Sequence, residues 1–181
     1  MADIEKSAIS GVVVVTPRVF TDDRGCFVET WRQEWLPVDS PAMVQSNRAD
    51  RIAGTLVGMH YHLRQSDYWY VPFGRAFVAL HDLRASSSSW GATATFEIGE
   101  HDHRGIYIPP GVAHGFYALT DLTITYLVDR YYDRNDELGV AWDDLDLDIS
   151  WPLRDGHAPA LSARDQANPL RSNLPEALRP R

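Results

Sequence analysis

The sequence has very little of what builds cross-linked or membrane-embedded proteins. Cys26 is the only cysteine, so neither an intrachain disulfide nor a thiolate metal cluster can form. The longest early apolar run, Val12 to Val15, is far too short to cross a membrane, and the opening "MADIEKSAIS" is acidic where a secretory leader is basic. We therefore expect a soluble protein of the cytoplasm.

Positive charge is also scarce. The 181 residues include 17 Lys and Arg against 25 Asp and Glu, and the sequence pI is near 5.2. Such a surface repels nucleic acid and anionic lipid, so we expect neither as a partner, and an anionic substrate must be met by local arginines. The length predicts one domain over residues 1–181, with a core at about 9–153 and a C-terminal wrap at 154–181.

What the sequence does have is strand signal. Short runs rich in Val, Ile, Thr, Tyr and Phe alternate with Gly, Pro, Asp and Ser clusters. The predicted strands cover residues 11–16, 26–31, 42–47, 55–62, 68–73, 76–83, 93–98, 105–108, 114–119 and 123–132. Only "WRQEWL" near residue 31 and "LSARDQA" near residue 161 are typical of helices. Many short strands predict an all-β sandwich or barrel.

One segment predicts a particular strand pairing. In "VPFGRAFVALHDLR", residues 71–84, a Pro72 to Gly74 turn precedes a run in which Ala76, Val78 and Leu80 alternate with Phe77, Ala79 and His81. We interpret this segment as a β-hairpin.

Two segments carry candidate chemistry. In "GTLVGMHYHLRQSDYWYV", residues 54–71, the alternation of an extended strand places His60 and His62 on one side. The same parity joins Tyr126 and Tyr132 in "YLVDRYY", provided that the strand is regular between them.

These residues resemble the two motifs of the cupins, which are small double-stranded jelly-roll barrels. The first motif corresponds to His60, His62, Asp67 and Gly74, and the second to the segment "PPGVAH" that ends at His114. The resemblance implies a jelly-roll barrel with N-terminal strands and short C-terminal helical segments.

A longer resemblance runs from residue 20 to about residue 170. The chain resembles the dTDP-4-dehydrorhamnose 3,5-epimerase family, a branch of the cupins, in the motifs "DDRGCFVETW", "VQSN", "GTLVGMHYH", "HDLR", "IYIPPGVAHGF", "YLVDRYY", "WDDLDLDISWP" and "LSARDQANP". It implies an isomerase that needs no metal and inverts C3 or C5, or both, of a nucleotide-linked 4-keto-6-deoxy sugar in deoxysugar biosynthesis. It also implies a homodimer.

The same resemblance assigns roles to residues. It implies that His60 is the catalytic base, that Asp165 orients it and that Tyr126 is the partner acid. Tyr132 then shapes the sugar pocket and His114 lines it.

Substrate contacts also follow from the resemblance. Arg24 corresponds to an arginine that contacts the diphosphate. Gln45 and Asn47 correspond to polar residues of the nucleotide and sugar pocket, and Glu137 falls near a segment that contacts the nucleotide.

Three positions depart from the family pattern. Val57 replaces an arginine, Asp67 replaces a lysine, and His62 stands where glutamine is common. Two alternatives therefore remain open. The first is a metal-dependent cupin isomerase or oxygenase that holds a divalent transition metal with His60, His62, Asp67 and His114. The second is a sugar-binding homologue without catalysis. Asp67 also fits a solvated loop carboxylate.

Overall fold

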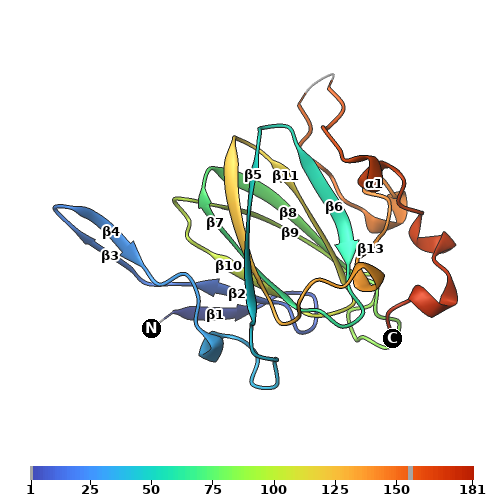
Figure 1. Ribbon diagram of the computed structural model, residues 1–181, viewed down its shortest axis with the longest axis horizontal. Coiled ribbons are helices and arrows are strands. Elements are labelled where there is room, and N and C mark those ends of the chain that lie inside the picture. Colours follow the sequence, from blue (N-terminus) through green and yellow to red (C-terminus); the bar gives the residue numbers. More distant parts are fainter. Residues whose placement is uncertain (1, 155–156) are drawn as a thin grey trace.

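Two antiparallel sheets pack against each other in the computed structural model, which describes residues 2–154 and 157–181 (Figure 1). The six-stranded sheet has the spatial order β1 (Asp3–Lys6), β2 (Val13–Thr16), β10 (Gly105–Ile108), β7 (Asp67–Phe73), β12 (Leu122–Val128) and β5 (Gln45–Arg51). The five-stranded sheet has the order β13 (Leu138–Gly139), β6 (Leu56–Tyr61), β11 (Val112–Ala118), β8 (Arg75–Asp82) and β9 (Thr93–Gly99). The predicted all-β, cupin-type jelly roll is confirmed.

Helical structure is short. The segment predicted to be helical near residue 161 forms one α-helix, α1 (Ala163–Gln166), and Ser162 Oγ caps it by accepting the backbone N–H of Asp165 at 3.1 Å. The helical segment predicted near residue 31 is reduced to one 3₁₀ turn. The 3₁₀ turns lie at Gln33–Trp35, Arg134–Asp136, Leu145–Leu147, Arg171–Asn173 and Glu176–Leu178. In the described residues, every helix is too short to span a bilayer.

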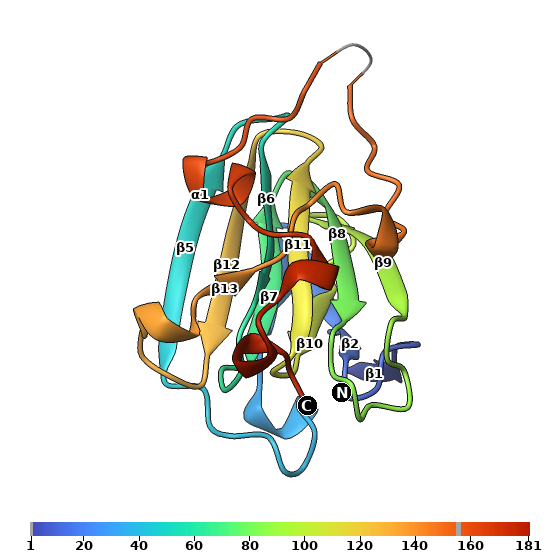
Figure 2. The ribbon, with the colours of Figure 1, turned by 90° about the vertical axis from the view of Figure 1, so that its right-hand side faces the viewer.

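The main core lies between the two sheets. On β8, Ala76, Val78 and Leu80 point into it, whereas Ala79 points to the outer face and joins a second cluster. This is the alternation that the sequence predicts. The second cluster is covered by the part of the chain that follows β13. From this part, Leu147 and Leu174 pack on the outer face of the five-stranded sheet (Figure 2).

The predicted hairpin between β7 and β8 is wrong. Only Gly74, at φ +74°, separates the two strands, yet β7 pairs with β10 and β12 while β8 pairs with β11 and β9. The turn carries the chain from one sheet to the other. Alternation is satisfied by either arrangement, because it specifies which side of a strand is buried and not which strand lies beside it.

A separate two-stranded hairpin extends away from the body (Figure 1). It consists of β3 (Val19–Asp22) and β4 (Gly25–Val28). Its side chains Phe20 and Phe27 are 46% and 65% exposed.

Candidate active site

A cavity of about 230 Å³ opens between the two sheets. The six-stranded sheet contributes side chains from β5, β7 and β12, and the five-stranded sheet contributes side chains from β6 and β11. The cavity is lined by Ala49, Arg51, Val57, His60, His62, Gln65, Asp67, Trp69, His114, Phe116, Ile124, Tyr126, Glu137 and Arg164. Of the nine predicted site residues, His60, Tyr126, His114 and Glu137 line this cavity, and Asp165 contacts His60 from behind.

A β-bulge in β6 shapes one wall. His114 pairs with His60, but Phe116 pairs with Val57, so β6 contains one more residue than β11 over this stretch. The bulge directs both Val57 and His60 toward the cavity, which unbroken alternation forbids. It requires a glycine, because Gly58 has φ +125° and a Cβ there would lie 2.9 Å from the carbonyl oxygen of His114.

The imidazole of His60 is held by a buried carboxylate. Its Nε2 lies 2.6 Å from Asp165 Oδ1, and Asp165 is 4% exposed. An ionised carboxylate only accepts hydrogen bonds, so Nε2 carries the proton and the lone pair of Nδ1 remains available as a base. Helix α1 positions Asp165, because the Ser162 cap fixes its backbone.

The pKa of Asp165 lies below its ordinary value. Burial raises this pKa, but the hydrogen bond and the charge of His60, with smaller contributions from Ser162 and the backbone of Gly58, outweigh burial. Asp165 is therefore an anion at neutral pH. It can stabilise the imidazolium that His60 becomes on accepting a proton.

Tyr126 lies on the opposite sheet from His60. Its strand, β12, pairs with β5 so that Tyr126 faces Asn47. Burial raises the pKa of the Tyr126 phenol, and the negative charge of Asp67 raises it further. The phenol therefore stays protonated at neutral pH and is available as an acid.

Three further polar side chains, His62, Asp67 and His114, form a buried cluster in the cavity wall. Asp67 is 3% exposed, so the solvated-loop interpretation of this carboxylate is wrong. Burial is also the main cause that lowers the pKa of His114. Only three of the four residues predicted as alternative metal ligands belong to this cluster, since His60 is engaged with Asp165.

Two arginines that the sequence reasoning missed supply positive charge to the cavity. Arg51 lies on β5 and Arg164 on α1, where its Nη1 donates to Glu137 Oε2 at 2.7 Å. Both had a signal in the sequence. Arg51 continues the every-second-residue series that begins at Gln45 and Asn47, and Arg164 precedes Asp165 in the "LSARD" motif.

Gln45 and Asn47 lie beside the cavity rather than in its lining. They occupy the same half-buried side of β5 as Arg51, and Gln45 Nε2 donates to Asn47 Oδ1 at 2.7 Å. Their position places amide groups next to Tyr126.

Arg24 and Tyr132 lie outside the cavity of their own chain. Arg24 is at the tip of the β3–β4 hairpin, with a side chain 90% exposed and paired with Asp22 at 2.6 Å. Tyr132 is 69% exposed, because β12 ends at Val128 and the chain then leaves the sheet. The regular strand expected through residue 132 is therefore wrong.

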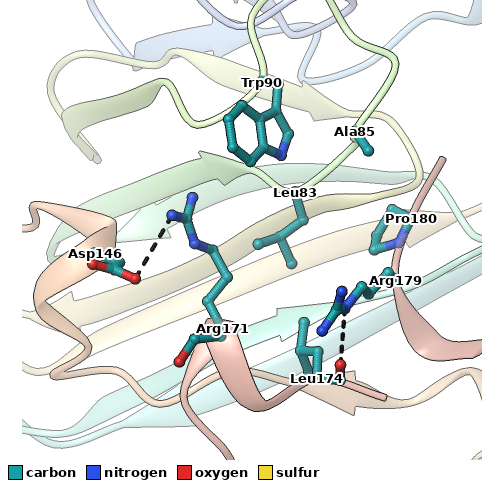
Figure 3. Close-up of a pocket in the computed structure, with 9 residues that line it drawn as sticks. Leu83, Ala85, Trp90, Asp146, Arg171, Leu174, Arg179 and Pro180 are labelled. Atoms are coloured by element: carbon teal, nitrogen blue, oxygen red, sulfur yellow. Dashed lines mark hydrogen bonds and ion pairs between the residues drawn. The ribbon is translucent and has the colours of Figure 1, made fainter. Parts of the chain in front are cut away.

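A second cavity, of about 300 Å³, lies outside the β sandwich and under the C-terminal segment (Figure 3). Its wall is mostly apolar, with Leu83, Trp90 and Leu174, and Arg171 reaches Asp146 across it at 3.7 Å. No histidine or tyrosine is among the described residues that line it. A base and an acid on facing walls therefore occur in the first cavity and not in this one.

Comparison with known proteins agrees with the motifs and the fold. The dTDP-4-dehydrorhamnose 3,5-epimerase family model matches residues 6–173. The chain is 32% identical over 174 residues to the dTDP-4-dehydrorhamnose 3,5-epimerase of Methanothermobacter thermautotrophicus, covering 93% of this chain and 94% of that protein.

Solved structures are similar over the same extent. A dTDP-6-deoxy-D-glucose-3,5-epimerase from Legionella pneumophila, in complex with dTDP-4-keto-L-rhamnose, matches with a TM-score of 0.93 and 29% identity over 100% of this chain and 98% of that one. A 3'-monoepimerase from Streptomyces bikiniensis, in complex with dTDP-quinovose, matches with a TM-score of 0.87 and 28% identity over 96% of this chain and 91% of that one. The chain belongs to the dTDP-4-dehydrorhamnose 3,5-epimerase family.

Proposed function

We propose that this protein epimerises a dTDP-linked 4-keto-6-deoxy sugar at C3, C5 or both, as a step in deoxysugar biosynthesis. The observation that carries the proposal is the 2.6 Å contact between His60 Nε2 and Asp165 Oδ1 in the wall of a cavity that Tyr126 also lines. The ligands of the Legionella and Streptomyces relatives support the substrate class. The reaction that we propose uses no metal ion.

One sheet supplies the base of the reaction and the other supplies the acid. A hydrogen on the carbon beside a ketone is a very weak acid, so the base must be held within hydrogen-bond reach of it. Nδ1 of His60 takes this proton, and the electrons of the C–H bond form an enolate. Asp165 stabilises the resulting imidazolium.

Tyr126 completes the inversion. Because His60 belongs to the five-stranded sheet and Tyr126 to the six-stranded sheet, a sugar ring between the sheets presents opposite faces to them. The phenol donates its proton to the carbon from the face that His60 does not reach, and the enolate electrons form the new C–H bond. Exchange with solvent then restores both side chains.

Arginines within the cavity compensate for the acidic surface and for Val57. Arg51 and Arg164 provide two guanidinium groups that suit the diphosphate of a nucleotide sugar. Glu137 holds Arg164 in place through their 2.7 Å ion pair. Gln45 and Asn47 add amide groups on the same strand as Arg51.

We further propose that the protein is a homodimer in which the β3–β4 hairpin lies against a second copy. An isolated two-stranded hairpin is only marginally stable in water, and this one exposes Phe20 and Phe27. A partner that covers the hairpin stabilises its two strands and removes the apolar surface of the two rings from water. In this dimer Arg24, at the hairpin tip, contributes its guanidinium group to the cavity of the other protomer.

Deuterium incorporation tests the catalytic proposal. We expect the unchanged protein to introduce solvent deuterium at C3, C5 or both of a dTDP-4-keto-6-deoxy sugar in deuterated water, as seen by NMR. The variant His60→Asn should lose this exchange, whereas the exposed control His101→Gln should keep it.

The variant Tyr126→Phe separates the two half-reactions. His60 still removes the proton and can return deuterium to the same face, so exchange continues while inverted product falls about 10²-fold or more. Tyr131→Phe, an exposed change on the same segment, is the matched control. Tight binding of the sugar nucleotide without exchange by the unchanged protein would instead identify a non-catalytic homologue.

A further inference from the structure

The His62–Asp67–His114 cluster has an excess of hydrogen-bond acceptors. All three side chains are at least nine-tenths buried. One nitrogen or carboxylate oxygen from each lies within 4.8 Å of those of the other two. Asp67 Oδ1 is 3.9 Å from His62 Nε2, and Asp67 Oδ2 is 4.0 Å from His114 Nε2. Each distance is too long for a hydrogen bond, so the three groups face a common space.

Backbone carbonyls set the tautomer of both imidazoles. His62 Nδ1 lies 2.7 Å from the carbonyl oxygen of Asp136, and His114 Nδ1 lies 3.0 Å from that of Val112. A carbonyl only accepts, so each Nδ1 carries the proton and each Nε2 presents a lone pair. Both Nε2 atoms lie about 4 Å from a carboxylate oxygen of Asp67.

Donors in this space are too few. The Gln65 amide lies 2.8 Å from Asp67 Oδ1 and 3.2 Å from His62 Nε2, and Trp69 Nε1 donates to Asp67 Oδ2 at 3.1 Å. Among the described residues, no group donates to His114 Nε2. Two imidazole nitrogens and a carboxylate therefore face one part of the cavity, and no Arg or Lys of the described residues is in hydrogen-bond contact with them.

We propose that the His62–Asp67–His114 cluster binds one divalent transition-metal ion, and that His60 is not a ligand. Two imidazole nitrogens and one carboxylate oxygen suit Zn²⁺ and its late first-row neighbours. An Nδ1–H group that donates to a backbone carbonyl is the arrangement that orients metal-binding histidines in general.

The dimensions fit once the three ligand atoms, which lie within 4.8 Å of one another, move closer together. Ligand bonds of about 2.1 Å place tetrahedral donor atoms roughly 3.4 Å apart. The carboxylate-to-imidazole distances of 3.9 and 4.0 Å must therefore shorten by about half an ångström. The Gln65 amide must rotate away or present its oxygen as a fourth ligand. The remaining coordination positions face the cavity.

This site differs from the four-ligand set that the sequence suggests as an alternative. The Nε2 atom of His60 is committed to Asp165 at 2.6 Å. The proposed ion therefore leaves the base and its carboxylate intact. The proposal does not depend on the epimerase reaction.

Cobalt binding tests the site directly. The full chain is purified with a tag that lacks histidine, treated with a chelator and titrated with Co²⁺, whose visible absorption reports nitrogen and oxygen coordination. We expect one Co²⁺ per chain, displaced by Zn²⁺. His62→Gln and Asp67→Asn should each weaken binding about 100-fold, and Zn²⁺ should raise the melting temperature of the unchanged protein but not of Asp67→Asn.

Two controls make the assignment specific. His101→Gln removes a histidine that is 91% exposed, and His60→Asn removes the base. Both should bind Co²⁺ as the unchanged protein does. Glutamine is common at position 62 in the family to which the chain belongs, so His62→Gln should fold. Circular dichroism checks that it does.

Three outcomes would overturn the proposal. The first is an unchanged protein that does not bind Co²⁺. The second is undiminished binding by folded His62→Gln and Asp67→Asn. The third is loss of binding in His60→Asn, which would assign the ion to a set that includes the base.

Discussion

At the scale of single residues, the contact between His60 and Asp165 is where geometry and charge act together. The carboxylate selects the tautomer in which Nδ1 is unprotonated, and its own lowered pKa keeps it anionic when His60 gains a proton. The substitution Asp165→Asn keeps the shape of the side chain but removes its negative charge. Asp165 is therefore a positioning residue that acts through His60.

This difference predicts the behaviour of Asp165→Asn. We expect kcat to fall about 10²- to 10⁴-fold while KM changes little, because the variant loses stabilisation of a charge that exists only after proton transfer. Steady-state kinetics measures the two effects. Asp146→Asn, which changes a carboxylate at the other cavity, is the control, and a rise in KM without loss of kcat would assign Asp165 to substrate binding instead.

At the scale of elements, the bulge in β6 depends on the absence of one side chain. Gly58 at φ +125° and Gly25 at φ +130° have nearly the same backbone conformation. A Cβ at Gly58 would lie 2.7 Å from Gly115 Cα, whereas a Cβ at Gly25 meets nothing within 4 Å. The two positions therefore separate backbone strain from steric clash.

We expect Gly58→Ala to lower the free energy of unfolding by about 3 kcal/mol and Gly25→Ala by about 1 kcal/mol, because both carry strain and only the first carries the clash. Urea denaturation followed by tryptophan fluorescence measures both. Equal losses in the two variants would show that the clash is relieved by movement of β11.

The loop after β8 is organised by a buried carboxylate. Asp82, 0% exposed, accepts hydrogen bonds from the backbone and guanidinium of Arg84 and from the hydroxyls of Ser87 and Ser89. The serine-rich stretch 85–91 forms the surface turn that its composition predicts, and Ser87 and Ser89 in it also donate to Asp82. Burial raises the pKa of Asp82, but these donors lower it more, to about 2.

Because the pKa of Asp82 is lower in the folded than in the unfolded chain, its stabilisation is complete above about pH 5 and disappears as the pH falls through 2. This pH-dependent part amounts to about 2–3 kcal/mol. We expect Asp82→Asn to lower the free energy of unfolding at pH 7 by at least this amount, and the difference from the unchanged protein to shrink toward pH 2. Denaturation at several pH values measures it, and a constant difference would exclude a charge effect.

At the scale of the whole molecule, the proposed homodimer depends on the β3–β4 hairpin. Replacing Phe27 by Glu should convert a dimer to a monomer in analytical ultracentrifugation, since a charge then occupies the apolar surface. Arg24→Ala should leave the dimer intact and raise KM.

Mixed dimers test whether Arg24 acts across the interface. Neither Arg24→Ala nor His60→Asn should have full activity alone. A mixed dimer of the two variants contains one cavity with both original residues only if Arg24 comes from the other chain. Recovery of activity on mixing is expected, and its absence in a proven mixed dimer would place Arg24 in its own cavity or in none.

Much of the architecture could be predicted because it rests on local regularities. Alternation in residues 76–80 showed which side chains of β8 are buried, and the turn residues separated most of the strands. The candidate site was predictable in part, because the motifs around His60, Tyr126 and Asp165 resemble a known family. Tyr132 was misplaced because the alternation argument assumes a regular strand, and β12 ends four residues earlier.

By itself, the sequence determined the all-β class, the family and the residues available for proton transfer. These follow from the order of side chains along the chain. Tertiary structure decided which sheet β8 joins, that a bulge directs both Val57 and His60 inward, that Arg51 and Arg164 share their cavity, and that Asp67 is buried between two imidazoles. The physical reason is that strand pairing, register and burial depend on contacts between segments distant in the chain, which local alternation cannot distinguish.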